Sequence, residues 1–197
     1  MADEVDKKRR SFLTRATAMV GVVGAAAAGV PFVASMWPNR SVEAAGAPIK
    51  VDIGKMKPGD QLTVIWRGRP VWIIRRTPQM LNELSKLNNL LRDPNSELEQ
   101  QPLEAKNLYR SLNPEFLVLV GVCTHLGCTP TYRPDPGTID KEWPGGFFCS
   151  CHGSKFDLAG RVFKGVPAPI NLEVPPYVFL NAKEILIGSS EIPQQIG

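Results

Sequence analysis

All four cysteines and both histidines of this 197-residue chain fall within two short segments. Residues 123–128 read CTHLGC, and residues 148–154 read FCSCHGS. Buried structural cysteines and surface histidines would be scattered along the chain, because nothing requires them to meet. The two segments therefore predict a fold that brings them together around a ligand bound by sulfur and imidazole.

Three ordinary explanations account for only part of this pattern. A disulfide framework would use the cysteines but leave both histidines unexplained. A structural zinc site needs four ligands, whereas six candidates are present and each segment mixes Cys with His. A dithiol redox pair normally has the spacing Cys-x-x-Cys, which neither segment contains. A structural zinc module on a membrane-tethered binding protein remains an alternative from a different class of function.

The first forty residues differ in character from the rest. Residues 16–37 carry no charged side chain, and as a helix they would extend roughly 33 Å, enough to cross a ~30 Å hydrocarbon core. We expect a single transmembrane anchor there. A cleaved signal peptide is the alternative, since AAGA at residues 44–47 offers small side chains, although the apolar region of such peptides is usually shorter. Basic side chains in residues 1–15 predict a cytoplasmic N-terminus, with the remaining chain on the opposite side.

Two further features flank this anchor. Residues 9–13 (RRSFL) resemble the twin-arginine signal, which directs export of folded proteins; simple topogenic charge is the alternative. Residues 38–48 (PNRSVEAAGAP) are polar and rich in small side chains, which predicts a flexible tether, either a hinge for the following domain or a passive spacer. The net charge is only +4 and no basic stripe interleaved with aromatic residues is present, so we expect no nucleic-acid partner.

Residues 49–197 are expected to form a mainly β domain with one helical insert. Alternating or continuous apolar runs predict strands at 61–66, 70–74, 115–123, 155–163 and 171–187. The apolar spacing changes to a helical period at residues 79–91, and we expect that stripe to pack on the sheet. A weaker helical pattern covers residues 96–111.

The pattern Cys123-x-His125 with Cys149-x-x-His152 resembles the signature of Rieske iron–sulfur proteins. The similarity continues through residues 153–175 (GSKFDLAGRVFKGVPAPINLEVP). The resemblance implies one [2Fe-2S] cluster, with the two cysteines on one iron and the two histidines on the other. It also implies a Rieske-type antiparallel β-sandwich in which a small subdomain, at about residues 115–175, binds the cluster.

The same resemblance assigns the remaining residues of the two segments. Cys128 and Cys151 would form a disulfide between them, as in the quinol-oxidising branch of the family, and an oxidising compartment would preserve that bond. His152 would hydrogen-bond a quinol and accept its proton. Leu126 would shield the cluster, although ordinary packing is an equal alternative for this residue.

Three positions further along complete the expected site. Pro167 lies in GVPAP at residues 165–169, which resembles the family's proline loop over the cluster, although any rigid turn could have this sequence. Ser154 matches a serine that hydrogen-bonds a bridging sulfide. Many relatives have Tyr where this chain has Phe156, so one hydrogen bond to a cysteine sulfur would be missing and a lower reduction potential is expected.

As a whole, the chain resembles the iron–sulfur subunit of bacterial ubiquinol–cytochrome c reductases, the cytochrome bc1 complex. The resemblance implies an oxidoreductase subunit that takes an electron from ubiquinol and passes it to cytochrome c1, contributing to proton translocation. It implies cytochrome b and cytochrome c1 as partners in a dimeric complex, and a single-pass protein of the bacterial inner membrane with its cluster on the periplasmic side. The alternative is the Rieske small subunit of an exported molybdenum oxidase of the arsenite oxidase type.

Overall fold

The computed structural model describes residues 6–37 and 46–191. The chain divides into two compact units, Met1–Ala44 and Ala45–Gly197, which are described separately. Most of the expected hinge, residues 38–45, lies outside the described residues. At its described end, the indole Nε1 of Trp66 donates a hydrogen bond to the carbonyl of Ala47 at 3.1 Å.

The first unit contains one long helix, α1 (Lys7–Ser35). Asp6 caps it, because its carboxylate accepts hydrogen bonds from the backbone N–H groups of Lys8 and Arg9. The helix therefore starts within the basic segment, well before the uncharged stretch begins at residue 16. It is long and apolar enough to cross a membrane, and none of its residues is buried.

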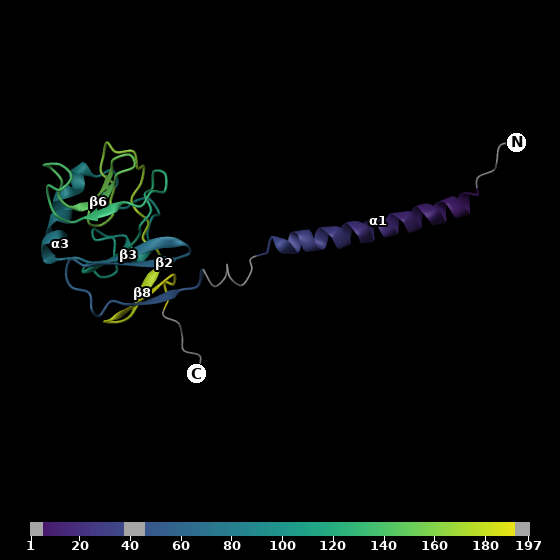
Figure 1. The fold of residues 1–197 in the computed structure, drawn as a ribbon, viewed down its shortest axis with the longest axis horizontal. Helices are drawn as coiled ribbons and strands as arrows, with labels where there is room; N and C mark the ends of the chain where they lie inside the picture. The colour runs from purple at the N-terminus through teal and green to yellow at the C-terminus, as the bar shows by residue number, and fades with distance from the viewer. Residues whose placement is uncertain (1–5, 38–45, 192–197) are drawn as a thin grey trace. The chain divides into compact units, whose positions relative to one another are not determined.

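The second unit is built from three antiparallel, three-stranded sheets. The first has the order β1 (Ile49–Asp52), β9 (Glu184–Ile187), β8 (Tyr177–Asn181). The second has the order β2 (Gln61–Trp66), β3 (Arg69–Arg75), β4 (Phe116–Val120), and the third β5 (Thr131–Arg133), β6 (Gly146–Cys149), β7 (Ser154–Phe156). In Figure 1, strands β2 and β3 lie between β6 and β8, so the third sheet occupies one end of this unit. The expected mainly β fold is confirmed.

A shared hydrophobic core joins the three sheets. Every residue of β4 is buried, as its continuous apolar sequence predicts. The Trp72 ring on β3 stacks on Phe147 of β6 with centroids 5.2 Å apart, which connects the central sheet to the third. Gly121, just after β4, must lack a side chain here, because a Cβ would lie 2.3 Å from the Trp72 ring.

The helical insert follows β3. Helix α3 (Pro78–Leu84) is capped by Thr77 and continues as a 3-10 helix, η1 (Ser85–Leu90). Its buried Leu84 packs with Leu158 and Ala159 in a second, smaller core. The stripe was expected to pack on the sheet, and Met80 and Leu81 do share this cluster with Tyr132 of β5.

The prediction of a second helix over residues 96–111 was wrong. This stretch contains only one short 3-10 turn, η2 (Leu103–Ala105). Ser96 and Arg110 have φ angles of 55° and 47°, which lie outside the right-handed helical region. Asn107 also bonds locally through its side chain, accepting from Tyr109 N–H and donating to the Ser111 carbonyl. Local side-chain bonding therefore replaces the helical ladder.

Two expected strands are shorter than the apolar runs suggested. The run at 155–163 is in strand conformation only to Phe156, because the chain turns at Asp157 and rejoins through a single bridge between Phe156 and Val162. The run at 171–187 forms the β8–β9 hairpin, which begins at Tyr177.

Candidate metal centre

Each of the two Cys/His segments is a tight loop that folds back on its first cysteine. In the first, which follows β4, Cys123 N–H donates to the Cys128 carbonyl at 2.7 Å. In the second, which joins β6 to β7, Gly153 N–H donates to the Cys149 carbonyl at 2.9 Å. Gly153 has a φ of 77°, so glycine suits this turn. A backbone hydrogen bond thus closes each of the two loops.

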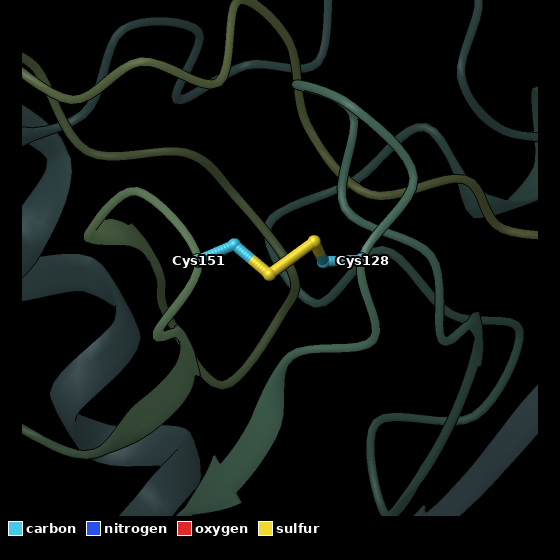
Figure 2. Close-up of a disulfide and its surroundings, with 2 residues drawn as sticks. All are labelled: Cys128 and Cys151. Carbon is cyan, nitrogen blue, oxygen red and sulfur yellow. A yellow bond between two sulfur atoms is a disulfide. The ribbon is translucent and has the colours of Figure 1, made fainter.

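A disulfide joins the two loops. Cys128 and Cys151 are bonded across 23 residues of sequence, with their Cα atoms 6.7 Å apart. Figure 2 shows that the two half-cystines come from different loops, so the bond holds the loops against each other. The expected pairing is confirmed.

The other two cysteines are free and buried. Cys123 is 3% exposed and Cys149 is 2% exposed. Burial raises the pKa of the Cys149 thiol, and the neighbouring Cys123 thiol raises it further. The sulfur of Cys149 also lies within 4.8 Å of both disulfide sulfurs. The disulfide uses the other two sulfurs, so only Cys123 and Cys149 have thiols that can bind metal.

The imidazole rings of the two histidines, one from each loop, lie next to each other. The rings of His125 and His152 have centroids 4.7 Å apart and are nearly perpendicular. Nδ1 of His125 is buried and has no hydrogen-bond partner among the described residues. A buried polar atom is almost always satisfied, so this nitrogen indicates a missing ligand. Two free thiols and two neighbouring imidazoles are the donor set of a Rieske [2Fe-2S] cluster, and the residues therefore fit that group.

The other residues expected at the site differ in their exposure. Leu126 is 70% exposed at the tip of the first loop, and His152 and Pro167 are also exposed. Ser154 is fully buried, and its hydroxyl accepts a hydrogen bond from Ala168 N–H at 3.0 Å. Phe156 is fully buried on β7.

The sequence pattern did not single out one hydroxyl near the donors, that of Thr124. Thr124, between Cys123 and His125, donates its hydroxyl to the carbonyl of Ile170 at 2.7 Å. This bond connects the first loop to the segment that follows Pro167. A threonine between two expected ligands was the available signal, but its partner lies 46 residues away in sequence.

Three buried arginines behind the site had also been missed. Arg76, Arg110 and Arg161 are each at most 1% exposed. Arg76 donates to the Leu158 carbonyl, and Arg110 donates to the Ala159 and Gly160 carbonyls. Burial lowers the pKa of Arg76 and of Arg110 to about 10, so both stay charged at neutral pH. Their side chains hold the turn at residues 157–161 in place.

Comparison with known protein families agrees with this site. The family described as "Rieske [2Fe-2S] domain" matches residues 93–176, which include both loops. The family described as "Ubiquitinol-cytochrome C reductase Fe-S subunit TAT signal" matches residues 1–39. Fold, donor set and family match together define an iron–sulfur protein of the Rieske class, whose cofactor is a [2Fe-2S] cluster.

Similar proteins narrow the class further. A "Ubiquinol-cytochrome c reductase iron-sulfur subunit" from Allochromatium vinosum is 56% identical over 95% of this chain and 91% of its own length. Proteins of the same description from Bradyrhizobium diazoefficiens and Blastochloris viridis are 44% and 40% identical, covering 91% and 95% of this chain and 94% and 97% of their own lengths. The chain belongs to the family of ubiquinol–cytochrome c reductase iron–sulfur subunits. Its export signal and apolar helix α1 indicate membrane anchoring.

Family membership decides between the alternatives. It favours the reductase subunit over the small subunit of an exported molybdenum oxidase. The Rieske match likewise favours an iron–sulfur centre over a structural zinc module.

Proposed function

We propose that this chain is the electron-carrying subunit of a bacterial ubiquinol–cytochrome c reductase. It accepts an electron from ubiquinol and passes it to cytochrome c1, and this transfer contributes to proton translocation. The observation that carries the proposal is that two buried free thiols and two adjacent imidazoles lie on two loops joined by a disulfide, in a chain of this family.

The four donors divide between the two irons. Cys123 and Cys149 bind one iron, and His125 and His152 bind the other. The bound cluster supplies a one-electron acceptor whose potential is high for an iron–sulfur centre, because neutral imidazoles replace two thiolates. The disulfide between Cys128 and Cys151 keeps the two loops at a fixed separation around the donors.

His152 is the residue that contacts the substrate. It is exposed, so its imidazole can reach a hydroxyl of the quinol, hydrogen-bond it and take up its proton. Exposed Leu126 and Pro167 surround the site with apolar surface. We infer that this apolar rim enters a pocket of cytochrome b and excludes water while the quinol is bound.

The N-terminal part of the chain supports a location for this site. The export signal at the N-terminus and helix α1 support a single-pass protein of the bacterial inner membrane with its cluster domain on the periplasmic side. Cytochrome b and cytochrome c1 are the partner subunits, in a dimeric complex. A hinge at residues 38–48, expected from the sequence and mostly outside the described residues, would let the domain move between the quinol pocket and cytochrome c1.

Turnover in membranes tests this function. Membranes that contain the full chain with its partner subunits should show ubiquinol-dependent reduction of cytochrome c, and Cys123→Ser should abolish it. Leu126→Ala should lower the rate roughly tenfold with the cluster's EPR spectrum unchanged, because an apolar contact in the quinol pocket is lost. Leu103→Ala is the matched control, since Leu103 is 81% exposed on η2.

Two results would contradict the proposal. Full activity in membranes that lack the chain would remove its role in turnover. A Leu126→Ala rate equal to that of Leu103→Ala would remove the proposed docking of the loop tip.

A further inference from the structure

Residues 163–170, here called the proline segment, contact both metal-binding loops. The segment contains no helix or strand, and only an isolated bridge at Phe163. Near its far end, Ala168 N–H donates to the hydroxyl of Ser154 at 3.0 Å, and the Ile170 carbonyl accepts from the hydroxyl of Thr124 at 2.7 Å. The position of the proline segment therefore sets the hydrogen bonding of one hydroxyl in each half of the site.

Two hydrogen bonds join the residues before the proline segment to those after it, and we call this junction of residues 160–162 with 171–172 the base of the segment. Leu172 N–H donates to the Gly160 carbonyl at 2.8 Å. Next to it, Val162 N–H donates to a side chain, the Oδ1 of Asn171, also at 2.8 Å. The side chain of Asn171 thus accepts a backbone hydrogen bond that a neighbouring strand would otherwise accept.

The same amide also reaches the connection that follows the helical insert. Nδ2 of Asn171 donates to the Asp93 carbonyl at 3.0 Å and lies 3.4 Å from the hydroxyl of Ser96. The residue is 1% exposed. Its oxygen and its nitrogen are therefore both hydrogen-bonded, and each bond connects a different part of the chain to the base of the proline segment.

We propose that Asn171 is a positioning residue for the iron–sulfur site. By closing the base of the proline segment it fixes the neighbouring Ile170 carbonyl, and with it the Thr124 hydroxyl between Cys123 and His125. The proposal rests on the Rieske cofactor, and it does not depend on which donor or acceptor the cluster serves.

Replacing Asn171 would break hydrogen bonds in the interior of the domain. Without the amide, the buried N–H of Val162 loses its partner, which is costly in an interior. The carbonyl of Asp93 loses the shorter of its two hydrogen bonds and keeps the one from Ser96 N–H at 3.4 Å. Asn171 is joined to Ile170 by one rigid peptide unit, so a shift at the base moves the Ile170 carbonyl away from Thr124. Hydrogen-bond donors around an iron–sulfur centre tune its potential, so a shift here changes the cluster as well as the fold.

The test uses the full chain with its partner subunits in membranes. Asn171→Leu keeps the branched skeleton of the side chain, with a somewhat larger volume, and removes its hydrogen bonds, whereas Asn171→Asp keeps the acceptor for Val162. Ser96→Ala removes only the longer contact. Ile185→Val, in β9 away from the loops, is a control for loss of stability alone. The readouts are the g-values of the reduced cluster, its midpoint potential and the rate of iron loss on warming.

We expect Asn171→Leu to shift the g-values and the midpoint potential and to speed iron loss roughly tenfold. Ser96→Ala and Ile185→Val should keep the g-values and the potential of the unmodified chain. If Asn171→Leu accumulates without iron, Asn171→Asp provides the measurement, with smaller shifts of the g-values. The proposal is overturned if the iron-containing Asn171 variants lose only thermal stability and keep the unmodified g-values and potential.

Discussion

Asp157 and Arg161 form an ion pair that is completely buried behind the strand that begins at Ser154. Nη2 of Arg161 lies 2.7 Å from Oδ2 of Asp157, and both side chains are 0% exposed. Arg161 also donates to the carbonyl of Leu84 at 2.6 Å and to the side chain of Asn88 at 2.9 Å. The pair therefore joins the helical insert to the turn that supports the metal-binding part of the domain.

Removing one member of this pair should be strongly destabilising. Arg161→Leu would leave the Asp157 carboxylate buried without its partner, at a cost of roughly 3–5 kcal/mol. Denaturant unfolding of the detergent-solubilised full chain measures the loss. Lys86→Ala is the control, because the Lys86–Glu83 pair is largely exposed and should contribute well under 1 kcal/mol. A loss below about 1 kcal/mol for Arg161→Leu would contradict this assignment.

Phe156→Tyr should raise the reduction potential of the cluster. The new hydroxyl can donate a hydrogen bond to a cysteine sulfur, which stabilises the added electron. One such bond corresponds to a rise of roughly 40 mV for a one-electron couple. An EPR-monitored redox titration measures it, with Phe179→Tyr on β8 as a control that should leave the potential unchanged. If the potential of Phe156→Tyr does not rise, the missing hydrogen bond is not what lowers it.

Loss of the disulfide should loosen both loops together. The double variant Cys128→Ser/Cys151→Ser removes a bond that closes a loop of 23 residues, which corresponds to about 3 kcal/mol in the chain-entropy account. We expect weaker resistance to denaturant and faster release of iron. Iron retention equal to that of the unmodified protein would show that the loops are held by other contacts.

Stability should fall at alkaline pH because of Tyr177. Burial raises the pKa of its phenol to about 12, and the hydroxyl accepts a hydrogen bond from Leu112 N–H. The folded state therefore holds the proton more tightly than the unfolded state, so this contribution is present below pH 10 and is lost between pH 10 and 12. It amounts to roughly 2–3 kcal/mol.

Tyr177→Phe separates this titration from the hydrogen bond. The variant should be about 1 kcal/mol less stable at pH 8, because Leu112 N–H loses its partner. Its unfolding free energy should then decline less steeply than that of the unmodified protein between pH 10 and 12. Parallel curves over that range would assign the alkaline loss to other groups.

The donor set was predictable from sequence because its chemistry is local. Cysteine and histidine at short spacings indicate a metal site whatever surrounds them, and the structure brings Cys123, Cys149, His125 and His152 into two neighbouring loops. Continuous apolar residues likewise predicted the buried strand β4. These features depend on residues that are close in the sequence.

The roles of some buried polar residues could not be predicted from the sequence, because they depend on partners far away along the chain. Arg161 looks like a surface residue until its carboxylate and carbonyl partners are known, some of them more than 70 positions away. Asn171 similarly gains its role from Val162 and Asp93. The helical pattern over residues 96–111 misled because the side chain of Asn107 bonds to the backbone nearby, an effect that apolar spacing does not register.

Cys123, His125, Cys149 and His152 should hold a cluster that a quinol can reduce. Pulsed EPR on the full chain in its membranes, after reduction by ubiquinol, tests both parts in one measurement. We predict the signal of a reduced [2Fe-2S] cluster with magnetic coupling to two histidine nitrogens, and no signal for Cys123→Ser. A quinol-reduced cluster without nitrogen coupling, or a protein that contains zinc and gives no signal, would contradict the account.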